Sequence, residues 1–299
     1  MSLSLSTFSA NRKILESLSL SVFSRGVRVQ IGDPVIGSLL WANYGEMQGT
    51  LDSVDLHYDV GRRRLTGSFF ISRANQKQLI AKNDGEFLYL FERDLSVQMQ
   101  RLRRDLYFVH SAVLEFGSRG WMLVGTNKSG KSTTTWGLLH HGFRYLSEDL
   151  GAIDPRTLEV YPYPRALWLR RNPPGSYPLP RRRFSTSWQV CIPTNDFPIE
   201  VMKEPIPLEG LVFLQCRPDV SEPSLRSLSK AEAAARLLFH ALNPGAHAAY
   251  GLDDAVKIAS RLPSFELLVG NLRATCVLLK DTLERGVLAN NFRVAKQVV

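Results

Sequence analysis

The residue pattern with the clearest chemistry is a glycine-rich run that ends in lysine and serine. Gly125, Gly130, Lys131 and Ser132 occupy the fixed positions of the pattern G-x-x-x-x-G-K-S/T. An apolar segment typical of a strand precedes the run and a segment typical of a helix follows it, which is the context in which this pattern binds phosphate. The alternative is a glycine turn with an incidental Gly-Lys-Ser. The candidate binding residues are Gly125, Thr126, Asn127, Lys128, Ser129, Gly130, Lys131, Ser132 and Thr133.

Each fixed residue of this run has a physical role in holding phosphate. Gly125 and Gly130 allow consecutive backbone N–H groups to point inward, which makes an anion-binding nest. The positive end of the following helix adds to that nest. Lys131, which we expect to be a surface lysine, can reach the β- and γ-phosphates, and the Ser132 hydroxyl can ligate Mg²⁺. The run therefore predicts binding of a nucleoside triphosphate, with ATP and Mg²⁺ as the expected pair.

Two adjacent carboxylates, Glu148 and Asp149, follow the next predicted strand. Ligands of an open α/β sheet lie at the carboxyl ends of the strands, so we expect this pair beside the γ-phosphate. One carboxylate would hold Mg²⁺ and the other would accept the proton of an attacking hydroxyl. We assign Asp149 to the metal together with Ser132, and both acids to the catalytic candidates. The alternative is a pair of exposed loop acids.

His110 and Lys131 complete the set of catalytic candidates. His110 lies on a predicted strand among Val109, Ala112 and Val113. Taken alone, that setting favours a core histidine whose side chain is satisfied by its neighbours.

The order of elements after residue 105 predicts an α/β fold. Strands are predicted at residues 107–116, 121–124, 143–146, 210–215 and 265–269, and helices at 132–141, 230–242, 253–261 and 272–284. We expect a P-loop kinase-like core sheet flanked by helices over residues 106–299.

The first 105 residues predict a smaller β-rich N-terminal lobe. Alternating apolar residues predict strands at 27–31 and within 51–60 and 65–71. Asn83-Asp84-Gly85 lies between two apolar runs and predicts a hairpin turn. Residues 92–104 predict a surface helix that joins this lobe, residues 1–105, to the nucleotide-binding domain, residues 106–299. Residues 170–193, rich in proline and arginine, predict a long loop or lid.

Composition narrows the class of protein and its partners. The net charge of +9 favours polyanionic partners such as nucleotide phosphates or an acidic protein. Nucleic acid is not an expected partner, because the chain lacks a recognised binding motif and interleaved aromatic and basic residues. Three cysteines without a Cys-x-x-Cys pair argue against a disulfide framework or zinc site and favour a reducing compartment. No apolar run reaches the roughly 20 residues of a membrane span. We expect a cytoplasmic location, and an oligomer is compatible with the sequence.

These motifs together resemble the HPr kinase/phosphorylase family, and more closely the HPr-kinase-related proteins. The resemblance rests on His-Ser-Ala at 110–112, the run at 125–132, His-Gly-Phe-Arg-Tyr-Leu at 141–146, Glu-Asp at 148–149 and a proline-rich element at 161–170. It is specific over residues 108–170 and looser over 206–279. It implies a P-loop kinase that uses ATP and Mg²⁺.

The resemblance also implies roles for individual residues. His110 would lie near the phosphates, Lys131 would be the phosphate lysine and Ser132 the Mg²⁺ ligand. Asp149 matches the second acid of the family's Asp-Asp pair, the proton acceptor for the target serine. Glu148 replaces the first acid, so which of the two serves as base stays open.

The chain departs from the family in its later part. The arginine- and glycine-rich signature that supports the phosphorylase reaction is absent, and the late catalytic arginine corresponds to either Arg165 or Arg217. The sequence therefore favours a kinase that transfers the γ-phosphoryl group to a hydroxyl on a serine or threonine of a peptide or protein, or on a small molecule. The alternative is a regulatory module that binds ATP and hydrolyses it slowly or not at all.

Overall fold

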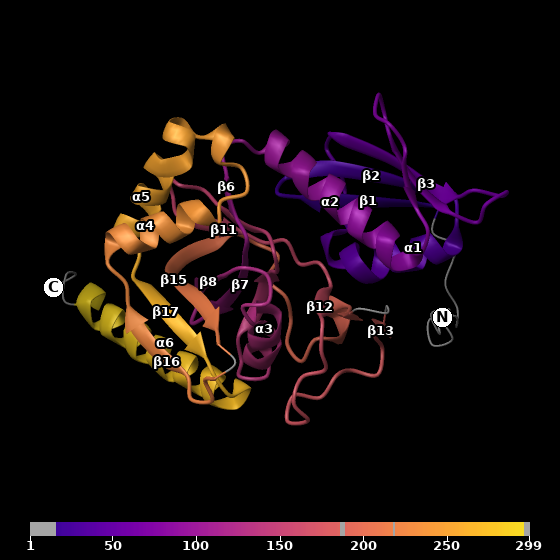
Figure 1. Ribbon diagram of the computed structural model, residues 1–299. Coiled ribbons are helices and arrows are strands. Elements are labelled where there is room, and N and C mark those ends of the chain that lie inside the picture. The colour runs from indigo at the N-terminus through magenta and orange to yellow at the C-terminus, as the bar shows by residue number, and fades with distance from the viewer. Residues whose placement is uncertain (1–15, 186–188, 218, 296–299) are drawn as a thin grey trace. The chain divides into compact units, whose positions relative to one another are not determined.

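The computed structural model describes residues 16–185, 189–217 and 219–295 (Figure 1). Within those residues the protein is a mixed α/β structure with several sheets and six α-helices. Two compact units can be distinguished. The first comprises the described chain up to Asp105 together with Pro162–Asn172 and Leu179–Phe197, and the second comprises Leu106–Tyr161, Pro173–Pro178 and the described chain from Pro198 onward.

The first unit is built on a sheet in which the described strands follow the order β1-β2-β3-β4-β5. Its strands are β1 (Ser17–Val22), β2 (Arg25–Ile31), β3 (Leu56–Arg62), β4 (Phe69–Arg73) and β5 (Leu79–Ala81). All neighbours pair antiparallel except β2 and β3, which are parallel and are connected through helix α1 (Pro34–Tyr44). Helix α2 (Asp84–Leu102) contacts α1 and the strands β4 and β5.

The hairpin predicted at Asn83-Asp84-Gly85 is wrong, because Asn83 caps the N-terminus of α2. The Asn83 side chain accepts a hydrogen bond from the Glu86 backbone N–H at 2.9 Å, and the Glu86 carboxylate accepts one from the Lys82 N–H at 2.7 Å. The first bond satisfies a donor that a helix start leaves free, and the second ties Glu86 to the residue before the cap. The predicted surface helix is the second half of α2, and one face of α2 is buried in the first unit through Phe87, Leu88, Phe91, Leu95 and Met99.

Helix α1 was missed by the sequence analysis, although its start carries a recognisable signal. Asp33 accepts hydrogen bonds from the N–H groups of Val35 and Ile36, and Pro34 occupies the first turn, where its missing N–H costs nothing. Asp-Pro is also a common turn signal in sequences, so this pair does not by itself identify a helix start.

The described residues of 170–193 are mainly loop, as predicted, but they include two short strands that the sequence did not predict. Strands β13 (Phe184–Ser185) and β14 (Val190–Ile192) form a sheet with β12 (Leu167–Leu169) in the order β12-β14-β13. Cys191 and Ile192 are fully buried in the first unit. Tyr177 is buried in the second unit, where its carbonyl accepts a hydrogen bond from Trp136 Nε1 at 3.2 Å. Residues 186–188 lie outside the described residues. Strands this short give no periodic signal in the sequence.

The second unit is built on a larger sheet, whose described strands follow the path β6-β10-β11-β15-β8-β7-β9, with β17 beside β15 and β16 beside β17. Its strands are β6 (Tyr107–Val109), β7 (Ser111–Phe116), β8 (Arg119–Val124), β9 (Arg144–Ser147), β10 (Gly151–Ile153), β11 (Glu159–Tyr161), β15 (Ile206–Cys216), β16 (Ser224–Ser227) and β17 (Ser264–Val269). The strand predicted at 107–116 is interrupted at His110, because β6 pairs with β10 while β7 pairs with β8 and β9.

Four helices cover the sheet of the second unit. They are α3 (Lys131–Leu139), α4 (Lys230–Phe239), α5 (Leu252–Arg261) and α6 (Leu272–Ala295). Figure 1 shows α4 and α5 on one side of the sheet and α6 on the other. Helix α3 packs against α6, and Gly137 permits the close approach because a Cβ there would lie 2.6 Å from Cys276 Sγ. None of the described helices is both long and apolar enough to span a membrane.

Parallel pairing of β15 with β8 and with β17 brings the carboxyl ends of three strands to one edge of the sheet. Val124 and Phe213, near the ends of β8 and β15, belong to the same buried core as Ala233 and Leu237 of α4. The loop that follows β8 and the C-terminal half of α4 are therefore held at this edge.

Replacing Asn83 with Ala is expected to lower the free energy of unfolding by about 1 kcal/mol, because the first turn of α2 loses its side-chain acceptor. Urea unfolding followed by circular dichroism measures the difference. Asn83→Asp is the matched control and should be close to the wild type, since Asp supplies the same acceptor. An Asn83→Ala protein as stable as the wild type would show that this cap contributes nothing.

Candidate functional site

The loop between β8 and α3 is shaped by residues with left-handed backbone conformations. Gly130, with φ 95°, is the N-cap of α3, and Lys128 has φ 68°. Gly125 is buried, and a Cβ there would lie 2.5 Å from Ser129 Oγ and 3.2 Å from the Leu214 carbonyl. No side chain fits at Gly125, and Gly130 adopts a conformation that costs other residues energy. The structure therefore explains why glycine occupies both positions of the motif.

Lys131 is buried inside the loop, so the expectation of a surface lysine is wrong: only 5% of the residue is exposed. Its Nζ donates hydrogen bonds to the carbonyls of Gly125 at 2.8 Å and Thr126 at 3.3 Å. A buried ammonium group needs such partners, because leaving it without them carries a large desolvation cost. The loop therefore closes around the Lys131 amine.

His110 lies where β6 ends and β7 begins, and its side chain joins the loop to the next strand. His110 Nε2 is 3.3 Å from Lys131 Nζ and 3.2 Å from Asp149 Oδ1. One ring nitrogen can accept from the ammonium group or donate to the carboxylate, but cannot do both at once. His110 Nε2 carries a proton when it donates to Asp149 and none when it accepts from Lys131. The His110 side chain is 21% exposed, so it is neither fully enclosed in the core nor free in solvent.

The two acids after β9 face different surroundings. Glu148 is fully buried, whereas 47% of the Asp149 side chain is exposed. Asp149 has φ 61°, a left-handed conformation that Asp and Asn adopt more readily than most residues. This bend turns the Asp149 carboxylate to His110. The structure therefore brings Asp149 together with His110 and Lys131, while Glu148 is enclosed in the protein interior.

The residues that could hold a metal ion are oxygen donors. Ser132 and Thr133 lie in the first turn of α3 and are partly exposed. Among the described residues no group of three or more His, Cys, Asp and Glu side chains is placed to hold a metal. Mg²⁺ commonly takes only one or two protein ligands and completes its shell with water and substrate phosphates. The hydroxyl of Ser132 and the carboxylate of Asp149 have the hard-oxygen chemistry that such an ion requires.

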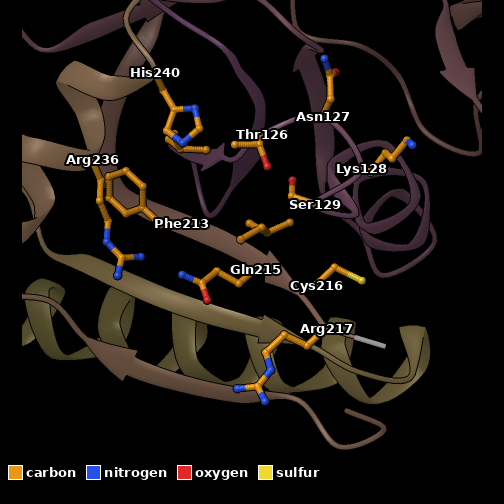
Figure 2. Close-up of a pocket in the computed structure, with 12 residues that line it drawn as sticks. Thr126, Asn127, Lys128, Ser129, Phe213, Gln215, Cys216, Arg217, Arg236 and His240 are labelled. Atoms are coloured by element: carbon orange, nitrogen blue, oxygen red, sulfur yellow. The ribbon is translucent and has the colours of Figure 1, made fainter. Parts of the chain in front are cut away.

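A cavity of about 580 Å³ lies beside the loop, and the sequence analysis did not find it (Figure 2). Its lining comes from three places: loop residues 126–129, residues 213–217 at the end of β15, and Arg236 and His240 at the end of α4. Arg236 and His240 are four residues apart, so they share one face of the helix. That spacing is the one signal of the cavity in the sequence, and it does not predict which strand the two residues face.

His240 connects this cavity to the candidate catalytic groups. Its carbonyl accepts a hydrogen bond from the His110 backbone N–H at 2.9 Å. Burial, which has the largest effect, and the nearby charges of His110, Lys131 and Arg236 together lower the pKa of His240 to about 4. His240 is therefore neutral at neutral pH and offers the cavity a hydrogen-bonding ring rather than a charge.

The two arginines considered from sequence lie in different units. Arg165 is buried in the first unit, where its Nε lies 3.3 Å from Glu92 Oε1, and the hydroxyls of Tyr44 and Tyr163 bind the same carboxylate. Arg217 lines the cavity of the second unit and its Nη2 lies 3.0 Å from Asp219 Oδ2. Of these two arginines, Arg217 is the one that lines the cavity beside the loop, together with Arg236.

Comparisons with known proteins reveal distant similarity to solved structures but no match in sequence. The chain matches no family model and no curated protein. Among solved structures it is similar to the Hpr(Ser) kinase/phosphatase from Coxiella burnetii, with a TM-score of 0.38 and 11% sequence identity. The similarity covers 64% of this chain and 96% of that one.

The stability of the protein is expected to fall in acid partly through His240. Its folded pKa of about 4 lies below the ordinary value of 6.5, so the unfolded chain binds more protons between these two pH values. The contribution of neutral His240 is fully present above the ordinary pKa and is lost as the pH falls toward 4. Thermal melts at about pH 7 and about pH 4.5 should show a smaller loss of Tm in His240→Asn than in the wild type.

Comparing the two proteins separates the effect of His240 from that of other histidines whose pKa values are also lowered. Burial also lowers the pKa of His140 and His141, and both are retained in the variant. Equal losses of Tm in the wild type and in His240→Asn would contradict the expected role of His240.

Proposed function

We propose that this protein is an ATP-dependent phosphotransferase, which transfers the γ-phosphoryl group of ATP to a hydroxyl group. The hydroxyl belongs to a serine or threonine of a peptide or protein, or to a small molecule. The observation that carries this proposal is the line of contacts from Lys131 through His110 to Asp149, with distances of 3.3 and 3.2 Å. His110 thus contacts both a lysine that can bind phosphate and a carboxylate that can accept a proton.

The phosphates of ATP would bind at the loop and at the start of α3. The first N–H groups of a helix lack partners within the helix, and its dipole favours negative charge. Lys131 would exchange the carbonyls of Gly125 and Thr126 for the β- and γ-phosphates, so its charge remains compensated throughout. This arrangement supports a nucleoside triphosphate over an uncharged ligand.

Transfer requires a group that takes the proton of the acceptor. The acceptor oxygen forms a bond to the γ-phosphorus as the bond to the bridging oxygen of ADP breaks, and the hydroxyl proton passes to Asp149. The exposure of Asp149 supports this role, and His110 positions the carboxylate. Catalysis rests mainly on positioning and on compensation of charge by Lys131.

Ser132 and one oxygen of the Asp149 carboxylate would hold Mg²⁺, which leaves the other oxygen of Asp149 for the proton of the acceptor. When bound, the ion neutralises charge on the phosphates. Both residues offer oxygen donors, and neither assignment requires a further protein ligand.

A second candidate is a regulatory module that binds ATP without transferring its phosphate. The full burial of Glu148 favours it, because only one acid of the pair is then accessible beside the loop. A single carboxylate suffices for a metal-dependent nucleotide sensor. The two candidates differ in whether an acceptor is phosphorylated.

Lys131→Ala is expected to weaken binding of ATP in the presence of Mg²⁺ by about tenfold or more, because a charge-assisted contact to phosphate is lost. Titration calorimetry measures the affinity, and circular dichroism verifies that the variant is folded. Lys257→Ala, an exposed lysine of α5, is the control and should bind ATP like the wild type. Wild-type affinity in folded Lys131→Ala would refute the role of the loop.

Asp149→Asn is expected to retain ATP binding and to lose phosphoryl transfer by about 10²- to 10⁴-fold, the range typical of general-base catalysis. Asn removes the charge without a backbone penalty, since it also adopts the left-handed conformation found at this position. The measurement is transfer of label from γ-labelled ATP to acceptors in a cell extract.

Glu148→Gln reports on the opposite assignment of the acid pair. If Glu148→Gln loses transfer while Asp149→Asn retains it, the roles within the pair are reversed. If both variants hydrolyse ATP like the wild type and no acceptor is labelled by any of the three proteins, the regulatory module replaces the phosphotransferase.

A further inference from the structure

The cavity beside the loop adjoins the end of the loop where the γ-phosphate would lie. It is lined by residues 126–129, which precede the motif's second glycine, and Ser132 and Thr133 at the start of α3 are not part of the lining. In this motif the lysine reaches the β- and γ-phosphates. Lys131 Nζ contacts His110, and the His110 N–H is bonded to the His240 carbonyl at the cavity wall. A molecule in the cavity would therefore lie on the side of the reacting groups.

The side chains that line the cavity are basic or neutral. Lys128, Arg217 and Arg236 are the charged lining residues, and the carboxylates that pair with Arg217 and Arg236, those of Asp219 and Glu266, are not among the lining residues of the described chain. Figure 2 shows Arg236 and His240 on one side and the loop residues on the other, with Gln215 and Cys216 along the strand between them. A concave surface with charges of one sign raises the local concentration of ligands of the opposite sign.

Arg236 and Gln215, two of the lining residues, are held by a carboxylate outside the lining. Glu266 of β17 receives Arg236 Nη1 at 2.6 Å, Gln215 Nε2 at 2.8 Å and Arg226 Nε at 2.5 Å. The Arg236 guanidinium also lies 6.0 Å from the centre of the Phe213 ring. Arg236 and Gln215 are thereby fixed in orientation before any ligand arrives, which lowers the entropy cost of binding.

We propose that this cavity binds the phosphoryl acceptor, and that the acceptor is a small hydroxyl compound with a carboxylate or phosphate group. This inference rests on the phosphotransferase function proposed above. The anionic group binds at Arg236 and Arg217, while the hydroxyl oxygen bonds to the γ-phosphorus, the bond to ADP breaks and the proton passes to Asp149. The volume of about 580 Å³ lies within the range typical of small-molecule sites.

The native cysteine Cys216 can be labelled to probe this cavity. The Cys216 thiol is exposed and lines the cavity, whereas Cys191 and Cys276 are buried. Two methanethiosulfonate reagents of similar size, the anionic sulfonatoethyl and the cationic trimethylammonioethyl compound, can be compared at this thiol. Each rate is divided by the rate of the same reagent with 2-mercaptoethanol, so that intrinsic reactivity cancels.

The anionic reagent is expected to modify Cys216 faster than the cationic reagent by roughly tenfold in low salt. Arg236→Gln should reduce this preference, and Arg217→Gln, which changes a more exposed side chain, serves if Arg236→Gln does not fold. No preference, or a preference for the cationic reagent, overturns the anionic class of the ligand.

The modified protein then tests the role of the cavity. With the sulfonatoethyl group on Cys216, ATP affinity should remain within about threefold of the wild type, and transfer to acceptors in the low-mass fraction of an extract should fall by about tenfold or more. Loss of ATP affinity would identify the cavity as the nucleoside site and overturn the inference. Unchanged transfer, or label confined to macromolecules, would overturn it as well.

The outcomes separate this inference from the function on which it rests. An unmodified protein that does not bind ATP contradicts the phosphotransferase itself, whatever the reagents show. An unmodified protein that binds ATP and transfers phosphate, but whose Cys216 shows no charge preference, retains that function and contradicts only the acceptor class.

Discussion

The buried ammonium group of Lys131 is the constraint on which the candidate site depends. Its charge is compensated by the carbonyls of Gly125 and Thr126 and lies beside His110. Because a buried charge requires such partners, the loop folds back on itself around Lys131. His110, at the point where β6 ends and β7 begins, lies within contact of the same amine. The left-handed residues of the loop and the bend at Asp149 both serve this geometry. The contacts of one lysine therefore organise the candidate site without any ligand.

Much of the site could be predicted because its signals are local in the sequence. The spacing of Gly125, Gly130 and Lys131 predicts the loop, and the position of Asp149 after a short strand predicts an acid nearby. The burial of Lys131 and the separation of Glu148 from Asp149 could not be predicted, since both depend on how β6, β7 and β9 pair. The cavity was beyond reach for the same reason, because it joins a loop, a strand and a helix that are distant in the chain.

The fold shows the same division between local and distant signals. The helices and most strands of the second unit follow from periodicity, whereas Asn83-Asp84-Gly85 is ambiguous in isolation, since Asn favours both turns and helix caps. What decides for α2 is Glu86, which closes the cap, and a row of aromatic and aliphatic residues that the first unit buries. The short strands β13 and β14 pair with each other, and β14 also pairs with β12, but each is too short to give a periodic signal.

The path of the chain between the two units limits how the protein can be divided. After entering the second unit at Leu106, the chain returns to the first unit for Pro162–Asn172 and again for Leu179–Phe197. The first of these segments binds Asn43, whose carbonyl accepts from the Ala166 N–H and whose side chain accepts from Trp168 Nε1. A fragment that begins at Leu106 would therefore carry Tyr163 and Leu167 without the surface that buries them. The two units are separate in packing but inseparable as gene segments, and shuffling either into another protein would require rejoining the chain at several points.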